Sequence, residues 1–172
     1  PGGRPPVAAA AVTDRPLGFV VVYAESSEPA GTGPVTTLGR AWPLKAGEVF
    51  FAGKVLKDAA RADGAVVKPT AWHLFPFTED YAHISRHHLT VEFEANGSIR
   101  LCDTSANGTW LVKGGVHLRR GRDESRIHTL AGDEALVLGV DLGANAAATA
   151  REKAGRYTLQ LIRAGRGMGG AA

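Results

Sequence analysis

The densest group of polar side chains lies at the start of the segment AHISRHHLTVEF and includes His83, His87 and His88. A shared metal ion would need these imidazoles on one side of the chain. On an extended strand His87 and His88 point to opposite faces, and His83 lies roughly 13 Å from His87 at about 3.3 Å per residue. No Cys or Glu-x-x-His pattern supplies further ligands, so we predict no metal site and no cofactor.

Ser85, His88 and Asp103 are the residue types of a hydrolytic triad. The Gly-x-Ser-x-Gly pattern is absent, and nothing marks Ser85 as lying on the strained turn that exposes a nucleophile. We therefore predict that the chain is not an enzyme, and a hydrolase is kept as a distant alternative.

Ser85 and Arg86 also suit the binding of an anion. The serine offers a hydroxyl donor, the arginine offers a charged fork, and a turn at Asn107 offers backbone and amide donors. These groups together could hold a phosphate in a loop. The simpler alternative is a polar strand end followed by an ordinary turn, and composition alone favours it.

Two short sequences, Asn96-Gly97-Ser98 and Asn107-Gly108-Thr109, fit the N-x-[ST] pattern of a glycan acceptor. Asn-Gly between alternating apolar residues is also the strongest local signal for a tight turn, because both residues tolerate positive φ. The amino end carries no charged and apolar leader, so we predict turns here rather than glycosylation.

Length and composition indicate one domain. At 172 residues the chain can bury a real core, and no stretch predicts a membrane span. The formal charge of +3, from 20 Lys and Arg against 17 acids, does not by itself indicate a nucleic-acid partner. The single cysteine, Cys102, excludes an internal disulfide, and we expect a buried structural thiol in a cytoplasmic protein.

Short apolar runs separated by turn signals predict a β protein. In the clearest run, Leu89, Val91 and Phe93 alternate with polar residues, which places three apolar side chains on one sheet face. Many short strands with Gly-rich turns predict a sandwich or barrel. The predicted strands cover residues 18–25, 48–53, 88–95, 98–103, 109–114, 135–140 and 157–164.

Three segments do not show this pattern of short apolar runs separated by turns. Residues 1–16 and 165–172 are expected to be a flexible lead-in or linker and a flexible tail. The sequence starts without methionine, so we expect a piece of a longer protein with further linked domains. Residues 55–83 are too long for a simple connection, with a helical turn expected around 56–62 and a strand over 72–77. A loop of this length is either functional or mobile.

Four motifs follow one another in the order of a known family: Ser85-x-x-His88, Asn107-Gly108-Thr109, Leu130-Ala131-Gly132-Asp133 and Leu138-Gly139. In this order and at this separation they resemble the forkhead-associated (FHA) domain, over roughly residues 17–164. The resemblance implies an all-β sandwich of about eleven strands that binds phosphothreonine peptides through loops at one end, without catalysis. The Gly and Ala content suggests a bacterial source.

The resemblance also implies roles for individual residues. Ser85 matches the serine that binds the phosphate, and Arg86 follows it where a further ligand contact is often made. His88 matches the histidine that braces the binding loops. Asn107 matches the asparagine that hydrogen-bonds the main chain of the peptide, and Gly108-Thr109 shapes its turn.

Two positions differ from the family pattern. Gly53 is kept, but Lys54 replaces the arginine that follows it, so the planar fork for bidentate binding is lost. Arg40 is an alternative candidate for that arginine. Ala106 stands where a Ser or Thr commonly adds a hydroxyl contact. Each lost hydrogen bond to a charged group could weaken binding by roughly 1.5 to 3 kcal/mol. The alternative function is therefore a degenerate FHA scaffold that binds a protein partner without phosphate.

The run from Gly-Arg to Ser-x-x-His is about twice the family's usual length, so residues 55–83 hold an insertion beside the proposed binding face. Trp72 or Phe75 could contact the peptide from this insertion. The alternative, which we prefer, is that these aromatic side chains cap the core of the sandwich.

The basic run HLRRGRDESR, residues 117–126, is balanced by acids and has no interleaved aromatic residues. We interpret it as a solvated surface and do not expect nucleic acid as a partner. Its arginines, Arg119, Arg120 and Arg122, could assist the binding of an acidic peptide.

Overall fold

The computed structural model describes residues 14–22, 24–25, 36–37, 40–60, 65–78, 81–118, 127–139 and 158–165. Most of the expected lead-in and tail lies outside these residues, as do Arg119, Arg120 and Arg122. Within the described parts, no helix is long and apolar enough to cross a membrane.

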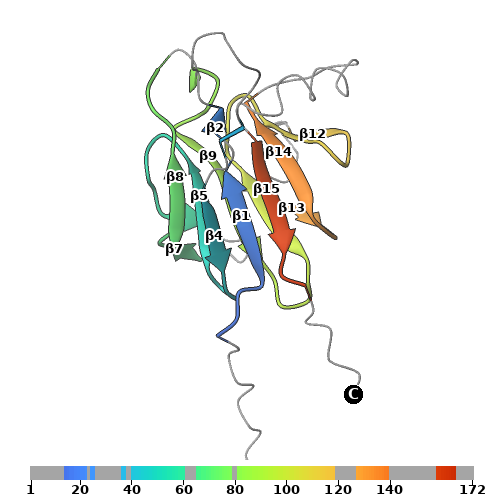
Figure 1. The fold of residues 1–172 in the computed structure, drawn as a ribbon. Helices are drawn as coiled ribbons and strands as arrows, with labels where there is room; N and C mark the ends of the chain where they lie inside the picture. The colour runs from blue at the N-terminus through green and yellow to red at the C-terminus, as the bar shows by residue number, and fades with distance from the viewer. Residues whose placement is uncertain are drawn as a thin grey trace, which may run out of the picture.

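Two β-sheets stack face to face as a sandwich (Figure 1). The larger sheet is antiparallel and has six strands, in the spatial order β12 (Val116–Leu118), β11 (Thr109–Leu111), β14 (Glu134–Leu138), β15 (Thr158–Arg163), β1 (Gly18–Val22) and β4 (Ala41–Leu44). The smaller sheet has five, in the order β13 (Ile127–Leu130), β10 (Ile99–Asp103), β9 (His87–Phe93), β5 (Val49–Gly53) and β8 (Ala71–Leu74). The expected all-β sandwich of about eleven strands is confirmed.

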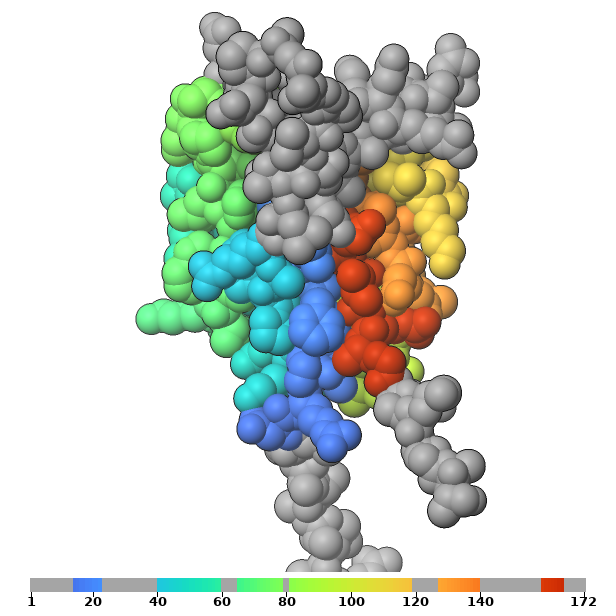
Figure 2. Space-filling view, viewed as in Figure 1, coloured from blue at the N-terminus to red at the C-terminus, as the bar shows by residue number. Residues whose placement is uncertain are grey.

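Two short ribbons lie outside the two large sheets. They pair β2 (Ala24–Glu25) with β3 (Thr36–Thr37), and β6 (Ala59–Ala60) with β7 (Val66–Val67). Figure 2 shows the outer surface of the larger sheet, where β4, β1 and β15 lie side by side.

The hydrophobic core fills the space between the sheets. The alternation predicted for β9 is confirmed, because Leu89, Val91 and Phe93 are each at most 2% exposed. Burying one such side chain contributes about 1.5 to 3 kcal/mol. Both sheets supply further core residues, among them Val20, Leu44, Phe50, Ile99, Leu101, Leu136, Leu138, Leu159 and Leu161.

The insertion forms a crossover between two parallel strands of the smaller sheet. The strand predicted over 72–77 is observed as β8, at 71–74, and it pairs with β5 in parallel. Parallel neighbours need a long connection, and residues 54–70 supply it. The helical turn expected around 56–62 is wrong for its described part, because Ala59 and Ala60 are extended and pair with β7.

The two Asn-Gly sequences form two kinds of turn. Asn96-Gly97 closes the hairpin between β9 and β10, where Gly97 has a φ of 88° and the Asn96 Oδ1 accepts a hydrogen bond from the Ser98 amide at 2.8 Å. Gly108 also has a positive φ, of 80°. It joins β10 in one sheet to β11 in the other, so it turns a corner between the sheets instead of closing a hairpin.

Cys102 is half-buried, so the expectation of a buried thiol is met only in part. It lies on β10 between Leu101 and Asp103, whose side chains are buried. Because successive side chains of a strand point to opposite faces, Cys102 lies on the face of its sheet that points away from the core.

A substitution at Gly18 tests how tightly the core is packed. A Cβ atom at this position of β1 would overlap the ring of Phe93. We expect Gly18→Ala to lower the free energy of unfolding by roughly 1 to 3 kcal/mol, because the core must shift to accept the extra carbon. Urea unfolding would measure the effect.

Gly114→Ala is the matched control. The nearest heavy atom to a Cβ at Gly114 would be a carboxylate oxygen of Glu134, at 3.6 Å. This variant should be about as stable as the wild type. If Gly18→Ala were equally stable, the packing of Gly18 against Phe93 would be contradicted.

Candidate functional site

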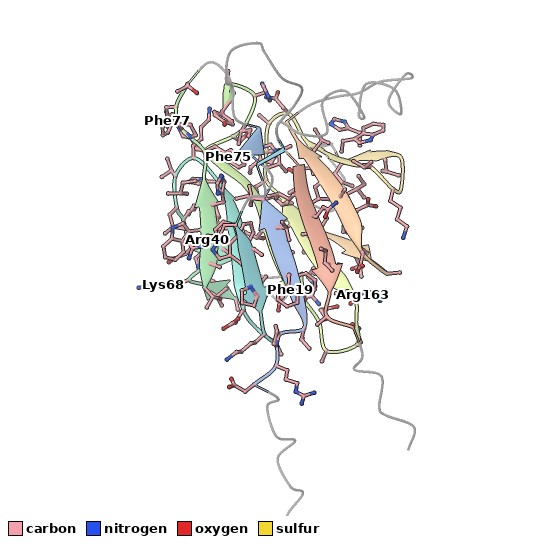
Figure 3. All side chains as sticks on the ribbon, in the orientation of Figure 1. Phe19, Arg40, Lys68, Phe75, Phe77 and Arg163 are labelled. Atoms are coloured by element: carbon pink, nitrogen blue, oxygen red, sulfur yellow. The ribbon has the colours of Figure 1, made fainter. Side chains whose placement is uncertain are left out.

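Three loops meet at one end of the sandwich. The first follows β5 at Gly53, the second leads through residues 81–86 into β9, and the third joins β10 to β11. Phe75 and Phe77, which follow β8, lie at this end, whereas Phe19 and Arg163 lie toward the other (Figure 3). Ser85, Lys54 and Asn107 each come from a different one of these loops.

A buried histidine joins two of the loops. The Ser85 amide donates a hydrogen bond to the His88 Nδ1 at 3.1 Å, and the His88 Nε2 lies 3.0 Å from the Gly108 carbonyl oxygen. Because Nδ1 accepts a hydrogen bond, Nε2 must carry the proton that is donated to Gly108. His88 is fully buried, and this burial lowers its pKa below the usual 6.5, against the opposing effect of Asp103. The imidazole is therefore neutral.

The same two hydrogen bonds argue against the hydrolase alternative. A triad needs a histidine nitrogen that accepts the hydroxyl proton of the serine. Both nitrogens of His88 are engaged with backbone groups. The Ser85 hydroxyl instead accepts a hydrogen bond from the Ala106 amide at 2.9 Å, so it lies against the third loop and not against a base.

Asn107 is exposed and is held from two sides. Its Nδ2 donates to the His83 carbonyl oxygen at 3.0 Å, and its own carbonyl oxygen lies 3.2 Å from the His117 Nε2. The His117 ring stacks on Trp110, with 5.9 Å between ring centroids. Among the described residues, no donor contacts the Asn107 Oδ1.

Ser105 supports the same loop and was not predicted from the sequence. Its Oγ donates to the Asp103 Oδ1 at 2.6 Å and accepts a hydrogen bond from the Gly108 amide at 2.8 Å. The Ser105 amide also donates to Asp103 Oδ1. The signal was present, since Asp-x-Ser after a strand is typical of a side-chain-stabilised turn. The triad hypothesis for Asp103 did not indicate this supporting role.

Two glycines permit close contacts between these loops. A Cβ at Gly108 would overlap the Leu118 carbonyl oxygen, and a Cβ at Gly53 would overlap that of Arg86. Thr109, the residue after Gly108, is fully buried at the start of β11. It therefore lies in the sheet, just beyond the turn it was expected to shape.

Lys54 and Arg86 are brought together by their backbones. The amides of Lys54 and Val55 both donate to the Arg86 carbonyl oxygen, at 2.8 and 3.0 Å. The Lys54 Nζ lies 5.5 Å from the ring centroid of Phe77, in a cation–π contact. Arg40, the alternative candidate, lies over the ring of Trp42 at 5.2 Å.

Lys57 and Arg86 lie close enough to His87 at this end of the sandwich to affect its titration. The pKa of His87 is lowered, first by its partial burial and then by the positive charges of Lys57 and Arg86. Lys54 adds a third cation beside Arg86. A group of cations around hydroxyl and amide donors favours an anionic ligand.

Of the two aromatic residues singled out in the insertion, only Phe75 caps the core. Phe75 is 5% exposed, and its ring lies 4.6 Å from that of His73 and 5.5 Å from that of Tyr81, between centroids. Trp72 is 45% exposed on β8. The core-capping interpretation therefore holds for Phe75 and is wrong for Trp72.

His88 predicts a pH dependence of stability. Because its pKa is lowered by folding, the unfolded chain takes up a proton near pH 6.5 while the folded chain does not. The stability that neutral His88 contributes is thus present above pH 6.5 and is lost as the pH falls toward its folded-state pKa. We expect His88→Gln to be less stable than the wild type by about 1 to 3 kcal/mol at pH 7.5, because a buried backbone group loses its partner.

The pKa values of His73 and His87 are also lowered, but both residues remain in the variant, so their effects cancel in the difference. Urea unfolding at several pH values should show the gap between wild type and His88→Gln narrowing from pH 7.5 to pH 5. A gap independent of pH would contradict the neutral, buried imidazole.

The family model of the FHA domain matches residues 70–129. No curated protein sequence matches the chain. A similar solved structure is the FHA domain of the CT664 protein from Chlamydia trachomatis, with 17% identity, coverage of 86% of this chain and 99% of the other, and a TM-score of 0.43.

Two further structures are similar at the same level. An engineered FHA domain with a Myc-pTBD peptide has 14% identity, coverage of 86% of this chain and 92% of the other, and a TM-score of 0.44. The N-terminal FHA domain of Rad53p from S. cerevisiae, in complex with a phosphothreonine peptide, has 15% identity, coverage of 84% and 90%, and a TM-score of 0.39. The family match spans Ser85, His88 and the turn at Asn107, so this part of the chain is similar to the FHA domain.

Proposed function

We propose that this domain binds a phosphothreonine-containing protein or peptide through Ser85, Arg86, Asn107 and Lys54. The observation that carries the proposal is the convergence of the three loops, because it gathers a hydroxyl, an amide and two cations at one end of the sandwich. A phosphate carries a charge of about −1.5 to −2 and three acceptor oxygens, which match these donors. FHA domains are phosphopeptide-binding modules, and this supports the assignment.

The neutral His88 and the buried Ser105 would support the site without touching the ligand. His88 fixes the Ser85 amide relative to Gly108, and Ser105 fixes the turn that carries Asn107. Loops that are held in place before binding lose less conformational entropy when the ligand arrives. Gly53, Gly108 and Thr109 belong to the same supporting role in this proposal.

A second candidate function is the binding of a partner without phosphate. The contact of Lys54 with Phe77 favours it, because an ammonium group that remains over the ring is not free to bind a phosphate. Ala106 offers no hydroxyl to replace the missing contact.

We further propose that the domain acts as a non-catalytic signalling module in a bacterial protein. The single cysteine supports a reducing compartment, and therefore the cytoplasm.

The test is fluorescence anisotropy against a degenerate phosphothreonine library, with phosphoserine and unphosphorylated libraries alongside. We expect selective binding of phosphothreonine that weakens as salt is raised. Ser85→Ala and Asn107→Ala should each weaken binding by roughly ten- to a hundredfold, which corresponds to about 1.5 to 3 kcal/mol for a hydrogen bond to a charged group.

Melting temperatures separate binding from folding in these variants. Ala106 and Asn107 are exposed, so water can replace the hydrogen bonds that the two substitutions remove. Both variants should therefore melt close to the wild type. Equal affinity for phosphorylated and unphosphorylated peptides would contradict the proposed function and favour the degenerate scaffold.

Lys54→Arg tests whether this side chain limits phosphate binding. Arginine restores the planar fork that can bind a phosphate through two hydrogen bonds. We expect affinity for the phosphothreonine library to rise by roughly three- to thirtyfold, or about 0.7 to 2 kcal/mol. Unchanged affinity in the same anisotropy assay would show that Lys54 is not the limiting contact.

A further inference from the structure

Four apolar side chains from the insertion are exposed next to Lys54. Phe77 is 66% exposed, Leu74 is 42%, and Val55 and Leu56 are each 41%. We call this group the apolar shelf. Single apolar residues are common on protein surfaces, whereas a contiguous group of them marks an interaction site.

The contacts of the backbone place the shelf beside the proposed phosphate site. The Val55 amide shares the Arg86 carbonyl oxygen with the Lys54 amide. Leu74 is the register partner of Gly53, the residue before Lys54. Phe77 contacts Lys54 through its ring. Val55, Leu74 and Phe77 therefore each lie next to Lys54 or to the residue before it.

The local fold does not need Phe77 to be apolar. Phe75, two residues earlier, already fills the core at this end of the sandwich. Figure 3 shows Phe77 farther out, at the rim of the molecule. One face of its ring receives the Lys54 ammonium, and most of its surface remains open to a ligand.

We propose that the apolar shelf binds a bulky apolar side chain of the phosphopeptide, and so makes the domain selective for phosphothreonine with such a residue nearby. This inference rests on the proposed function. Charge indicates that the ligand of the shelf is part of the phosphopeptide, because Lys54 and Arg86 border the shelf and would hold the phosphate of the same peptide. No separate partner is then required to cover the shelf.

One peptide can reach both the Lys54 ammonium and the apolar shelf. The Lys54 Nζ and the Phe77 centroid lie 5.5 Å apart. An extended peptide advances about 3.3 Å per residue, so a side chain within about three residues of the phosphothreonine would reach the shelf.

The test compares pairs of phosphothreonine peptides that differ at one position, which carries Leu in one peptide and the uncharged, similarly sized Asn in the other. This position is moved from three residues before the phosphothreonine to three residues after it. At one or more positions we expect the wild type to bind the Leu peptide roughly tenfold more tightly, as burial of a leucine side chain would give. Phe77→Ala should reduce this ratio to about twofold or less.

The ratio of the affinities for the two peptides reports on the shelf and not on Lys54. Phe77→Ala also releases the Lys54 ammonium, but this change acts on the phosphate of both peptides alike. Val55→Ser is a second, independent variant on the shelf and should lower the ratio too. Ile162→Ala is the control, because Ile162 is 37% exposed on β15, beside Phe19 and away from the site.

The outcomes separate the two proposals. If the wild type binds phosphothreonine peptides but Leu and Asn give equal affinity at every position, the shelf inference is overturned and the proposed function stands. An unchanged ratio in both Phe77→Ala and Val55→Ser would also overturn it. If no phosphothreonine peptide binds, the proposed function fails and the inference fails with it.

Discussion

The fixed, neutral state of His88 is the constraint on which the loops at this end of the sandwich depend. One ring nitrogen accepts from the Ser85 amide and the other donates to the Gly108 carbonyl oxygen, with the ring fully buried. The Gly108 carbonyl oxygen also accepts from the Gly139 amide at 2.8 Å. The imidazole thus links the loop before β9 to the corner between the sheets, and the Gly108 carbonyl oxygen links this corner to the residue after β14. A protonated ring could not accept from Ser85, so the linkage requires the neutral form.

Local patterns predicted the parts of the fold that depend on neighbours in the sequence. The alternation of Leu89, Val91 and Phe93 predicted the core face of β9, and the two Asn-Gly sequences predicted turns with positive φ. The parallel pairing of β5 with β8 was not predicted, because it brings together residues about twenty positions apart and leaves no local periodicity. The extended Ala59–Ala60 pair was missed for a related reason. Its alanines favour a helix by propensity, but they pair with β7 instead.

The order of the motifs indicated Ser85, His88 and Asn107, and the structure brings their loops together. The order of the motifs could not indicate Phe77, because this residue belongs to none of the motifs. Phe77 is brought to the site by its contact with Lys54 across the crossover. Ser105 was missed although its spacing from Asp103 carries a turn signal. The insertion therefore contributes in two ways: Phe75 extends the core, and Phe77 with its neighbours leaves an apolar surface beside the cations. The flexible ammonium of Lys54 lies over the ring of Phe77 at the edge of this surface.

The central claim is that the three loops form one site for a phosphorylated threonine. The most direct measurement is a ¹⁵N–¹H NMR titration of the domain with a phosphothreonine peptide and with its unphosphorylated copy. The account predicts that the phosphorylated peptide shifts the amide signals of Lys54, Ser85, Arg86, Ala106 and Asn107 together, while the unphosphorylated copy leaves them in place. Equal shifts with both peptides, or shifts confined to residues outside these loops, would contradict it.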